Sequence, residues 1–440
     1  MAKESWLPDY SPASDFSLAN IPFGIISTPD NQTPRPAIAI GDFALDLKTW
    51  LPMINKETVS DVFPGVDISQ LTHALSQSTL NAFAALGRPV HRIVRKGIQD
   101  LLPKDTPFPQ LLQDNEEGRT KALKRLSEVT MHLPMEIGDY TDFYAGYHHA
   151  YAVGVIFRGP ENALQSNYMH LPVGYHGRAS SIVVDGTPIR RPVGQILLDP
   201  KAEPKQPVVG PTRKLDIELE LGCFISKPNE MGEAVDVKQA QEHIFGYVLL
   251  NDWSARDIQA WEYVPLGPFN GKNFGTTISA WIVLADALEP FRVKSEIENK
   301  TELQGYLKEE GEKGAFDIKL EVDLTTADGS ETTIGRTSSK YLMWSFPQMI
   351  AHHTLGGCPM RTGDLLGSGT ISGPGGVKER GSLLEMTENG KNEVLLAGMN
   401  ARTFLKDGDS VTLRGFCDDG SGVRVGFGRC AGKIYSAVQR

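Results

Sequence analysis

The sequence predicts a mainly β protein with some helices, in which a small N-terminal β unit precedes a large C-terminal β-sandwich or β-roll. Two observations support this fold class. Short apolar runs bounded by Gly and Pro recur along the chain, without the regular alternation of strand and helix that a Rossmann domain requires. The chain has 440 residues, which is too long for one small core, so two domains are expected.

The first domain is expected to span residues 1–134. Apolar runs broken by Pro and Gly predict a compact β-barrel or sheet with strands over residues 21–27, 37–40 and 43–47. A helical pattern follows over 80–102, interrupted at 87–89, and a second helical run extends to about Val129. We place the domain boundary at Pro134.

The second domain is expected to span residues 135–440 and to be rich in strands. Further apolar runs punctuated by Gly and Pro predict strands over 181–184, 215–225, 246–250, 278–285, 316–324, 411–413 and 423–427. One helix is expected to begin near Ser345, with Pro347 in its first turn, and to stop at Gly356 and Gly357.

Three acidic residues, Asp216, Glu218 and Glu220, alternate with aliphatic residues in one of these runs. On a single strand they share one face, and like charges about 7 Å apart repel by about 2 kcal/mol per pair at an effective dielectric near 20. A cation would relieve this repulsion, and carboxylate oxygens favour Mg²⁺ or Ca²⁺ over zinc. The alternative is a half-exposed strand with a solvated acidic face.

The composition excludes several classes of protein. Hydrophobic residues make up 40% and charged residues 22%, as in an ordinary globular protein. A formal charge of -10 argues against a nucleic-acid partner. No apolar run reaches the length of a membrane span, and the N-terminus lacks the apolar core of a signal peptide. Four scattered cysteines fit reduced thiols in a cytoplasmic protein.

Familiar catalytic motifs are missing from the sequence. It contains no G-x-S-x-G nucleophile elbow. The glycines at 267 and 271 have the wrong spacing for a P-loop, and the glycine-rich stretch 420–428 is better read as hairpin turns. The sequence therefore gives no indication of a nucleotide ligand.

A dense polar segment follows the apolar run at 246–250. Asp252 stands at the end of that run, a position from which side chains commonly project into a site. Arg256, Gln259 and Tyr263 fall at i, i+3 and i+7, so a helical turn aligns them on one face. Arg, Gln, Tyr and Lys donors suit carboxylates or a developing oxyanion. The alternatives are a salt bridge, a packed tyrosine edge and a solvated lysine.

The histidines at 148 and 149 cannot share one role, because neighbouring residues on a helix point about 100° apart. An unperturbed imidazole titrates near pH ~6.5, which suits His149 as a general base toward water. The alternative is an ordinary surface or core histidine. The pair His352 and His353 is explained by the preference of histidine for a helix C-terminus.

Several long strings in the chain resemble the fumarylacetoacetate hydrolase family. They are TDFY at 141–144, HLPVGYHGRASSIVV at 170–184, ELE at 218–220, NDWSARDIQ at 251–259, WEYVPLGPF at 261–269, GTTIS at 275–279 and SGTISG at 368–373. The resemblance is dense from about residue 135 onward and looser before it. It implies an N-terminal SH3-like β-barrel followed by a mixed β-roll of the fumarylacetoacetase type.

The resemblance also implies the residues of the site. It implies a calcium ion bound by Asp142, Glu218, Glu220 and Asp252, and a magnesium ion near Asp252, Lys272 and Thr276. It makes His149 the general base, polarised by Glu385, and leaves Asp216 without a ligand role. Oxyanion stabilisation is expected from Arg256, Gln259 and Lys272. Substrate contacts are expected from Tyr144, Arg158, Tyr175, Gln259, Tyr263 and Thr370.

The activity that the resemblance implies is metal-dependent hydrolysis of a carbon–carbon bond in a diketo acid. Water activated by His149 would split 4-fumarylacetoacetate into fumarate and acetoacetate, the last step of tyrosine and phenylalanine breakdown, in a cytoplasmic homodimer. One alternative is a related enzyme acting on another 2-oxo or 1,3-diketo acid. The other is a non-catalytic calcium-binding β-sandwich.

Overall fold

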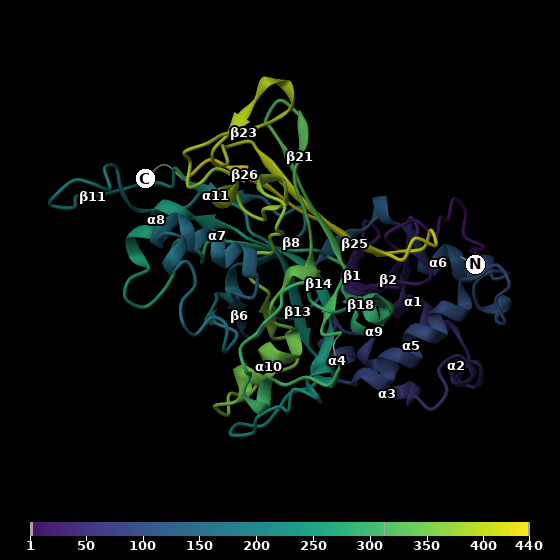
Figure 1. Cartoon of the computed structure of the whole chain (residues 1–440). Helices are drawn as coiled ribbons and strands as arrows, with labels where there is room; N and C mark the ends of the chain where they lie inside the picture. The colour runs from purple at the N-terminus through teal and green to yellow at the C-terminus, as the bar shows by residue number, and fades with distance from the viewer. Residues whose placement is uncertain (1–2, 312, 439–440) are drawn as a thin grey trace.

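The computed structural model describes residues 3–311 and 313–438. The N-terminal elements, purple to blue in Figure 1, gather on one side of the molecule, and the strands of the C-terminal part run away from them. Within the described residues, none of the helices combines the length and the apolar character needed to cross a membrane.

The N-terminal part contains a five-stranded antiparallel sheet. Its strands lie in the order β4 (Leu123–Arg125), β3 (Phe43–Asp46), β2 (Asn31–Ile40), β1 (Phe23–Thr28) and β5 (Thr130–His132). The strands predicted from the three apolar runs are thus confirmed. Among the described residues, the edge strands β4 and β5 do not pair with each other, so a closed SH3-like barrel stays a prediction.

Helices lie beside this sheet (Figure 1). They are α1 (Leu47–Trp50), α2 (Lys56–Val62), α3 (Ile68–Ala74), α4 (Asn81–Ala84), α5 (Arg88–Leu101) and α6 (Glu116–Ala122). The break expected at 87–89 is present, and Gly87 takes a left-handed φ of 84° immediately before α5. The helical run expected to reach Val129 is wrong. It stops at Ala122 because Leu123 begins β4, which pairs with β3.

The C-terminal part is built on one large sheet. Its main path is β7 (Gly174–His176), β6 (Tyr140–Phe143), β22 (Leu365–Gly367), β13 (Leu219–Ile225), β14 (Ile244–Asp252), β16 (Thr276–Ile278) and β8 (Ile182–Val184), and β17 (Val283–Leu284) also pairs with β14. The central strands β13 and β14 are buried on both faces, whereas β7 at the edge of the sheet is largely exposed.

A second sheet packs against the first through β14. Its order is β21 (Glu331–Ser338), β20 (Lys319–Thr325), β25 (Ser410–Asp418), β26 (Arg424–Tyr435) and β9 (Ile189–Arg190). Leu221 and Cys223 of β13 face the core shared with this sheet. Phe224 faces the opposite way, into a core that contains Phe23 and Phe83 of the N-terminal part. The predicted β-rich fold with helices is confirmed at this level.

Four strand pairs complete the fold. They are β10 (Val193–Leu197) with β11 (Pro207–Pro211), β12 (Leu215–Asp216) with β15 (Ser254–Ala255), β18 (Arg292–Val293) with β19 (Ala315–Phe316), and β23 (Val394–Leu395) with β24 (Ala401–Arg402). The segment around β11 extends away from the body of the molecule in Figure 1.

The helices of the C-terminal part are short. They are α7 (Tyr147–Arg158), α8 (Arg256–Glu262), α9 (Ala285–Leu288), α10 (Phe346–Thr354) and α11 (Leu383–Met386). Helix α10 confirms the helix expected near Ser345. Ser345 and Gln348 form a capping box at its start, and His352 and His353 lie in its last turn, as predicted.

Candidate active site

The run of three acids does not form one continuous strand. Strand β12 ends at Asp216 and β13 begins at Leu219, so Glu218 lies in the break between them. Asp216, Glu218 and Glu220 are 0%, 5% and 0% exposed. The alternative of a solvated acidic face is therefore wrong, because all three carboxylates are inside the protein.

Four carboxylates meet at the large sheet. Strand register places Asp142 opposite Gly367 and Asp252 opposite Thr276. All four acids are buried, and each offers an oxygen within 4.8 Å of the others; they are Asp142, Glu218, Glu220 and Asp252. These are the four residues expected to hold calcium, and the fold brings them together from β6, β13, β14 and the segment before β13. We call this group the acidic cluster.

The acidic cluster fits a hard metal ion. Asp142 Oδ1 and Glu220 Oε1 are buried and have no hydrogen-bond partner, and such orphaned oxygens are costly unless a cation completes them. A Cβ placed on Gly367 would lie 3.0 Å from Glu220 Oε2 and 3.1 Å from Asp142 Oδ1. The bare backbone at Gly367 thus leaves room beside the carboxylates. Ligands that are all oxygen suit Ca²⁺ or Mg²⁺.

The electrostatics of the acidic cluster show a shortage of positive charge. Burial, followed by the charges of Asp142 and Asp252, raises the pKa of Glu220 well above its ordinary value. Burial and then Asp252 likewise raise the pKa of Asp142. Glu218 behaves differently: burial raises its pKa, but Lys272 and Arg256 outweigh burial and hold it at about 2.

Two cations reach the acidic cluster. The Lys272 ammonium donates to Glu218 and to Asp252, and Arg256 Nη1 lies 2.7 Å from Glu218 Oε1. Burial lowers the pKa of Lys272, but Asp252 and Glu218 raise it by more than burial lowers it. The net shift is upward, so the ammonium group stays charged. Thr276, expected near a magnesium ion, donates its hydroxyl to Asp252 Oδ1 at 3.2 Å.

His149 and Glu385 form a buried pair, although 236 positions separate them in the chain. His149 Nδ1 lies 2.6 Å from Glu385 Oε2, and the two side chains are 3% and 0% exposed. Burial raises the pKa of Glu385, but His149 and Ser382 outweigh it and the net shift is downward, so the carboxylate is ionised. An ionised acceptor fixes the proton on Nδ1 and leaves Nε2 free to accept one.

Most of the residues expected to contact substrate lie around this pair and the acidic cluster. The Tyr144 ring packs edge-on against the His149 ring, with 5.5 Å between centroids. Tyr175 donates to Asp252 Oδ2 at 3.4 Å, and Arg256 Nη1 donates to Gln259 Oε1 at 3.4 Å. Thr370 is buried, and its hydroxyl has no partner.

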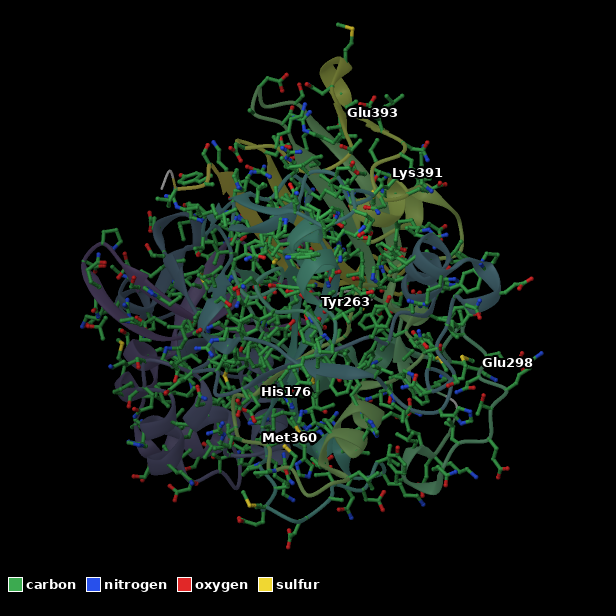
Figure 2. The ribbon with its side chains drawn as sticks, turned by 90° about the vertical axis from the view of Figure 1, so that its left-hand side faces the viewer. His176, Tyr263, Glu298, Met360, Lys391 and Glu393 are labelled. Carbon is green, nitrogen blue, oxygen red and sulfur yellow. The ribbon has the colours of Figure 1, made fainter. Side chains whose placement is uncertain are left out.

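Two of the expected substrate residues lie at the surface. Arg158 ends α7 and donates to the carbonyls of Asn162 and Ala163, so its guanidinium already has partners. Tyr263 follows α8 and is 52% exposed; Figure 2 labels it near the middle of the view. Direct substrate contacts by Arg158 and Tyr263 therefore stay predictions.

Some residues of the site were missed by the sequence reasoning. Tyr140 lies in the strand that carries Asp142, and its buried hydroxyl has no partner. The hydroxyls of Ser372 and Ser382 contact the Glu385 carboxylate at 3.0 and 2.8 Å. Ser372 lies inside the string SGTISG, so that string held a signal, whereas Tyr140 depends on strand register that no local pattern shows.

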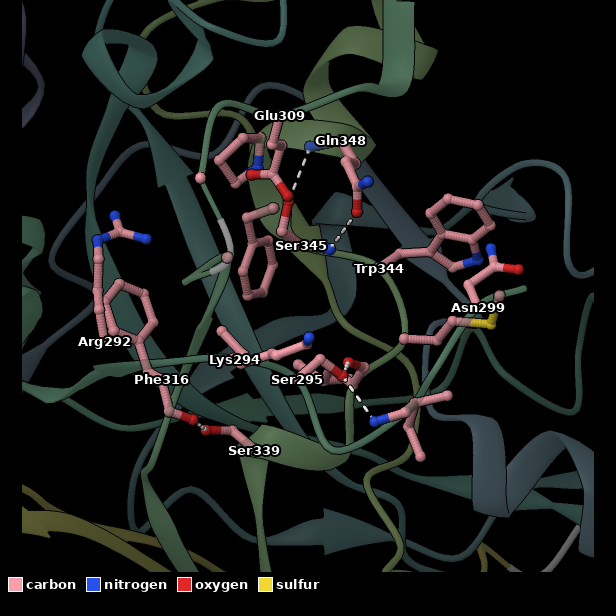
Figure 3. Close-up of a pocket in the computed structure, with 18 of the residues that line it drawn as sticks. Arg292, Lys294, Ser295, Asn299, Glu309, Phe316, Ser339, Trp344, Ser345 and Gln348 are labelled. Atoms are coloured by element: carbon pink, nitrogen blue, oxygen red, sulfur yellow. Dashed lines mark hydrogen bonds between the residues drawn. The ribbon is translucent and has the colours of Figure 1, made fainter. Parts of the chain in front are cut away.

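A separate cavity of about 450 Å³ lies elsewhere in the C-terminal part (Figure 3). Its lining combines apolar residues such as Phe316 and Trp344 with charged ones such as Arg292 and Glu309. None of the residues expected in the site lines it. The cavity is therefore distinct from the acidic cluster and the His149–Glu385 pair.

Comparison with known proteins agrees with this geometry. Residues 140–434 match the family "Fumarylacetoacetate (FAA) hydrolase C-terminal" and residues 19–134 match "Fumarylacetoacetase N-terminal". The chain is 59% identical to fumarylacetoacetase fahA of Aspergillus fumigatus over 99% of both chains. It is 46% identical to human fumarylacetoacetase over 97% of both.

Solved structures show the same fold at low identity. Fumarylacetoacetate hydrolase from psychrophilic Exiguobacterium antarcticum is 16% identical, with a TM-score of 0.51 over 94% of this chain and 99% of that one. Cg1458 with inhibitor gives a TM-score of 0.51 at 14% identity, over 95% of this chain and 100% of that one. The family matches cover most of the chain, and the chain therefore belongs to the fumarylacetoacetate hydrolase family.

Proposed function

We propose that this protein is a fumarylacetoacetase, a hydrolase that splits 4-fumarylacetoacetate into fumarate and acetoacetate in the breakdown of tyrosine and phenylalanine. The observation that supports this most directly is the buried His149–Glu385 pair near carboxylates that include two unpartnered oxygens. Such an arrangement supplies a base for water and a place for a Lewis acid. Among the described residues of the site, the hydroxyls of Ser372 and Ser382 donate to Glu385 and not to His149, in keeping with the missing elbow motif.

His149 acts as the general base. Its Nδ1–H donates to Glu385, so Nε2 takes a proton from water and the hydroxide adds to the carbonyl next to the bond that breaks. Glu385 stabilises the imidazolium that forms. The electron pair of the broken bond leaves with the acetoacetate fragment, which is then protonated at carbon.

Arg256, Gln259 and Lys272 are the donors for the developing oxyanion. Arg256 Nη2 is buried without a partner, and such a donor can turn to a substrate oxygen without giving up an existing hydrogen bond. Tyr144, Tyr175 and Thr370 are proposed to orient the substrate. The Thr370 hydroxyl is likewise unpartnered.

We assign the acidic cluster to Ca²⁺, held by Asp142, Glu218, Glu220 and Asp252. When bound, a divalent ion polarises the diketo oxygens and lowers the energy of an enolate leaving group. A second ion, Mg²⁺, is proposed beside Asp252 and Thr276. The Lys272 nitrogen is the only atom of that side chain that could bind a metal, and it is protonated. Lys272 would therefore balance the charge of the carboxylates there rather than act as a ligand.

The wider organisation follows the same family. We propose domains at 1–134 and 135–440, with an SH3-like barrel in the first, and the spans of the two family matches support this division. We also propose a homodimer in the cytoplasm. Size-exclusion chromatography with light scattering tests the oligomeric state.

The decisive experiment incubates purified protein with fumarylacetoacetate and follows the loss of diketone absorbance. Turnover is expected with Ca²⁺ or Mg²⁺ present, and fumarate and acetoacetate should appear in equal amounts. Another 2-oxo or 1,3-diketo acid serves as the comparison substrate. If that acid is consumed and fumarylacetoacetate is not, the proposed function is wrong.

A further inference from the structure

Asp216 is the one acid of the Asp216–Glu218–Glu220 run that lies outside the acidic cluster, yet it is completely buried. Its two oxygens accept four hydrogen bonds. Oδ1 accepts from the backbone N–H of Ile217 at 2.8 Å and of Leu383 at 2.7 Å. Oδ2 accepts from Arg256 Nε at 2.8 Å and from the Leu384 N–H at 3.0 Å.

Two of these donors are the first backbone N–H groups of α11. The first N–H groups of a helix have no partner within the helix, and a negative charge near them is favourable. The N-cap residue of α11 is Ser382, whose hydroxyl accepts from the Glu385 N–H at a long 3.4 Å. Asp216, arriving from β12, therefore provides the stronger anchor for the start of α11.

Glu385 follows Leu384 directly in the same short helix. Its carboxylate reaches His149 at 2.6 Å and accepts from Ser382 at 2.8 Å. A shift of α11 would move Glu385 with it, and the hydrogen bond to Glu385 sets the tautomer of the His149 ring and helps to orient it.

We propose that Asp216 is a positioning residue: it fixes α11 and, through Glu385, the ring of His149. Arg256 and the Ile217 N–H hold Asp216 in place, while Asp216 holds the helix that carries Glu385. The expected loss of rate rests on the proposed hydrolysis. The expected displacement of α11 and of the His149 ring does not depend on that activity.

The test substitution is Asp216→Asn. An amide keeps the shape but accepts on one atom only, so its NH₂ group must face two donors whichever way it turns. One N–H of α11 then loses its acceptor. Loss of a residue that orients a functional group typically costs 10- to 100-fold, so we expect kcat to fall about 30-fold with KM changed less than about twofold.

A matched control is available in the N-terminal part. Asp46 is 1% exposed, accepts from Arg35 Nε at 2.5 Å and caps the four-residue helix α1 through the Thr49 N–H at 2.9 Å. Asp46→Asn neutralises an equally buried carboxylate that binds an arginine and a short helix, in the five-stranded N-terminal sheet and not in the sheet that carries the acidic cluster. It should lower the melting temperature and leave kcat and KM unchanged.

A double-mutant cycle separates positioning from mere structural support. If Asp216 acts through Glu385, the cost of Asp216→Asn in kcat shrinks to less than about threefold in a Glu385→Gln background, because residues of one unit are not additive. If the full cost persists in that background, Asp216 serves only as a counter-ion to Arg256 and the proposal is overturned.

A second readout does not depend on turnover. In ¹⁵N-histidine-labelled protein, the Nδ1 proton of His149 should give a protected low-field resonance, assigned by its loss in Glu385→Gln. We expect Asp216→Asn to lose this resonance and Asp46→Asn to keep it. Should the wild-type protein fail to hydrolyse fumarylacetoacetate, the proposed function fails, while this resonance still decides the role of Asp216: an unchanged resonance in Asp216→Asn rejects it.

Discussion

Two clusters of charge in this molecule are built in opposite ways. Between α5 and α9, three guanidinium groups surround two carboxylates; the residues are Arg88, Arg92, Arg292, Asp286 and Glu289. In the acidic cluster, four carboxylates meet only Lys272 and Arg256. Among the ion pairs of residues 3–311 and 313–438, Asp142 and Glu220 have no cationic partner.

The pKa values follow this difference. Burial raises the pKa of Asp286, but hydrogen bonds from Arg88 and Arg92 outweigh burial and the net shift is downward. Burial and neighbouring carboxylates raise the pKa of Glu220 well above normal. In the first cluster both carboxylates have guanidinium partners, and the cluster joins parts of the fold. In the second, Asp142 and Glu220 lack such partners, which is the pattern expected of a group of acids that could hold a metal ion.

Removal of divalent ions should have the largest effect on turnover. It should act on the acidic cluster and leave the cluster between α5 and α9 unchanged. Lewis-acid stabilisation of several kcal/mol, taken as about 4, corresponds to roughly 1000-fold in rate. We therefore expect chelation to reduce turnover by about that factor and calcium to restore it. Metal analysis of the purified protein before and after chelation provides the control. Full activity in protein shown to be free of metal would contradict the assignment of the acidic cluster.

His149→Ala should separate the base from the ion. We expect turnover to fall at least ~100-fold, the usual scale for a general base. Calcium binding should persist, because the four acids of the cluster are untouched. Calorimetric titration with calcium and the rate of diketone loss check both parts. A calcium-binding protein without catalysis would instead show no turnover in either form.

The strings that carry the family resemblance contain most of the residues that the fold gathers around the acidic cluster and the His149–Glu385 pair. They did not predict that Asp216 binds Arg256 and the start of α11. The run 215–221 alternates as a strand should, yet it breaks at Ile217 because β12 pairs with β15 while β13 pairs with β14 and β22. Which strands pair is decided by long-range packing, so the local pattern grouped Asp216 with Glu218 and Glu220, and the resemblance left Asp216 without a ligand role.

The same limit explains the other differences. The pattern near Val129 looked helical, but Leu123–Arg125 fills an edge of the N-terminal sheet beside β3. Nothing in the sequence marked Gly367, and only its register opposite Asp142 shows that its missing side chain leaves room beside the carboxylates. Periodicity predicts which elements form, whereas the neighbours of each element depend on the whole fold.

Neutralising one acid in each cluster should change stability in opposite directions. At pH 8 without metal, the Glu220 carboxyl must either repel its neighbours, by about 3 kcal/mol per pair near 4.8 Å, or bind a proton that the unfolded chain does not hold. Glu220→Gln removes this cost, so the melting temperature should rise while calcium affinity falls. Asp286→Asn leaves Arg88 short of a partner and should lower stability by about 2 kcal/mol. Thermal melts of both variants check this. A fall in both melting temperatures would show that the acidic cluster is complete without an ion.

Stabilisation by calcium should also depend on pH. A carboxyl whose pKa is raised on folding holds its proton to higher pH than the unfolded chain does. The metal-free protein therefore loses stability as pH rises above the ordinary values of 3.8 for Asp142 and 4.5 for Glu220. Glu218, with a pKa of about 2, is ionised throughout pH 5 to 8 and adds no slope.

Calcium displaces the protons of Asp142 and Glu220, so its stabilising effect should grow with pH, by at most about 1.4 kcal/mol per pH unit for each proton released. Burial lowers the pKa of His91 to about 4, so this histidine also makes stability depend on pH. Its contribution is the same with and without calcium and cancels when the two stabilities are subtracted. Melting temperatures with and without calcium from pH 5 to 8 measure that difference. In Glu220→Gln, the difference in melting temperature with and without calcium should vary less with pH. If that difference does not vary with pH in the wild-type protein, Asp142 and Glu220 are already ionised before the ion binds.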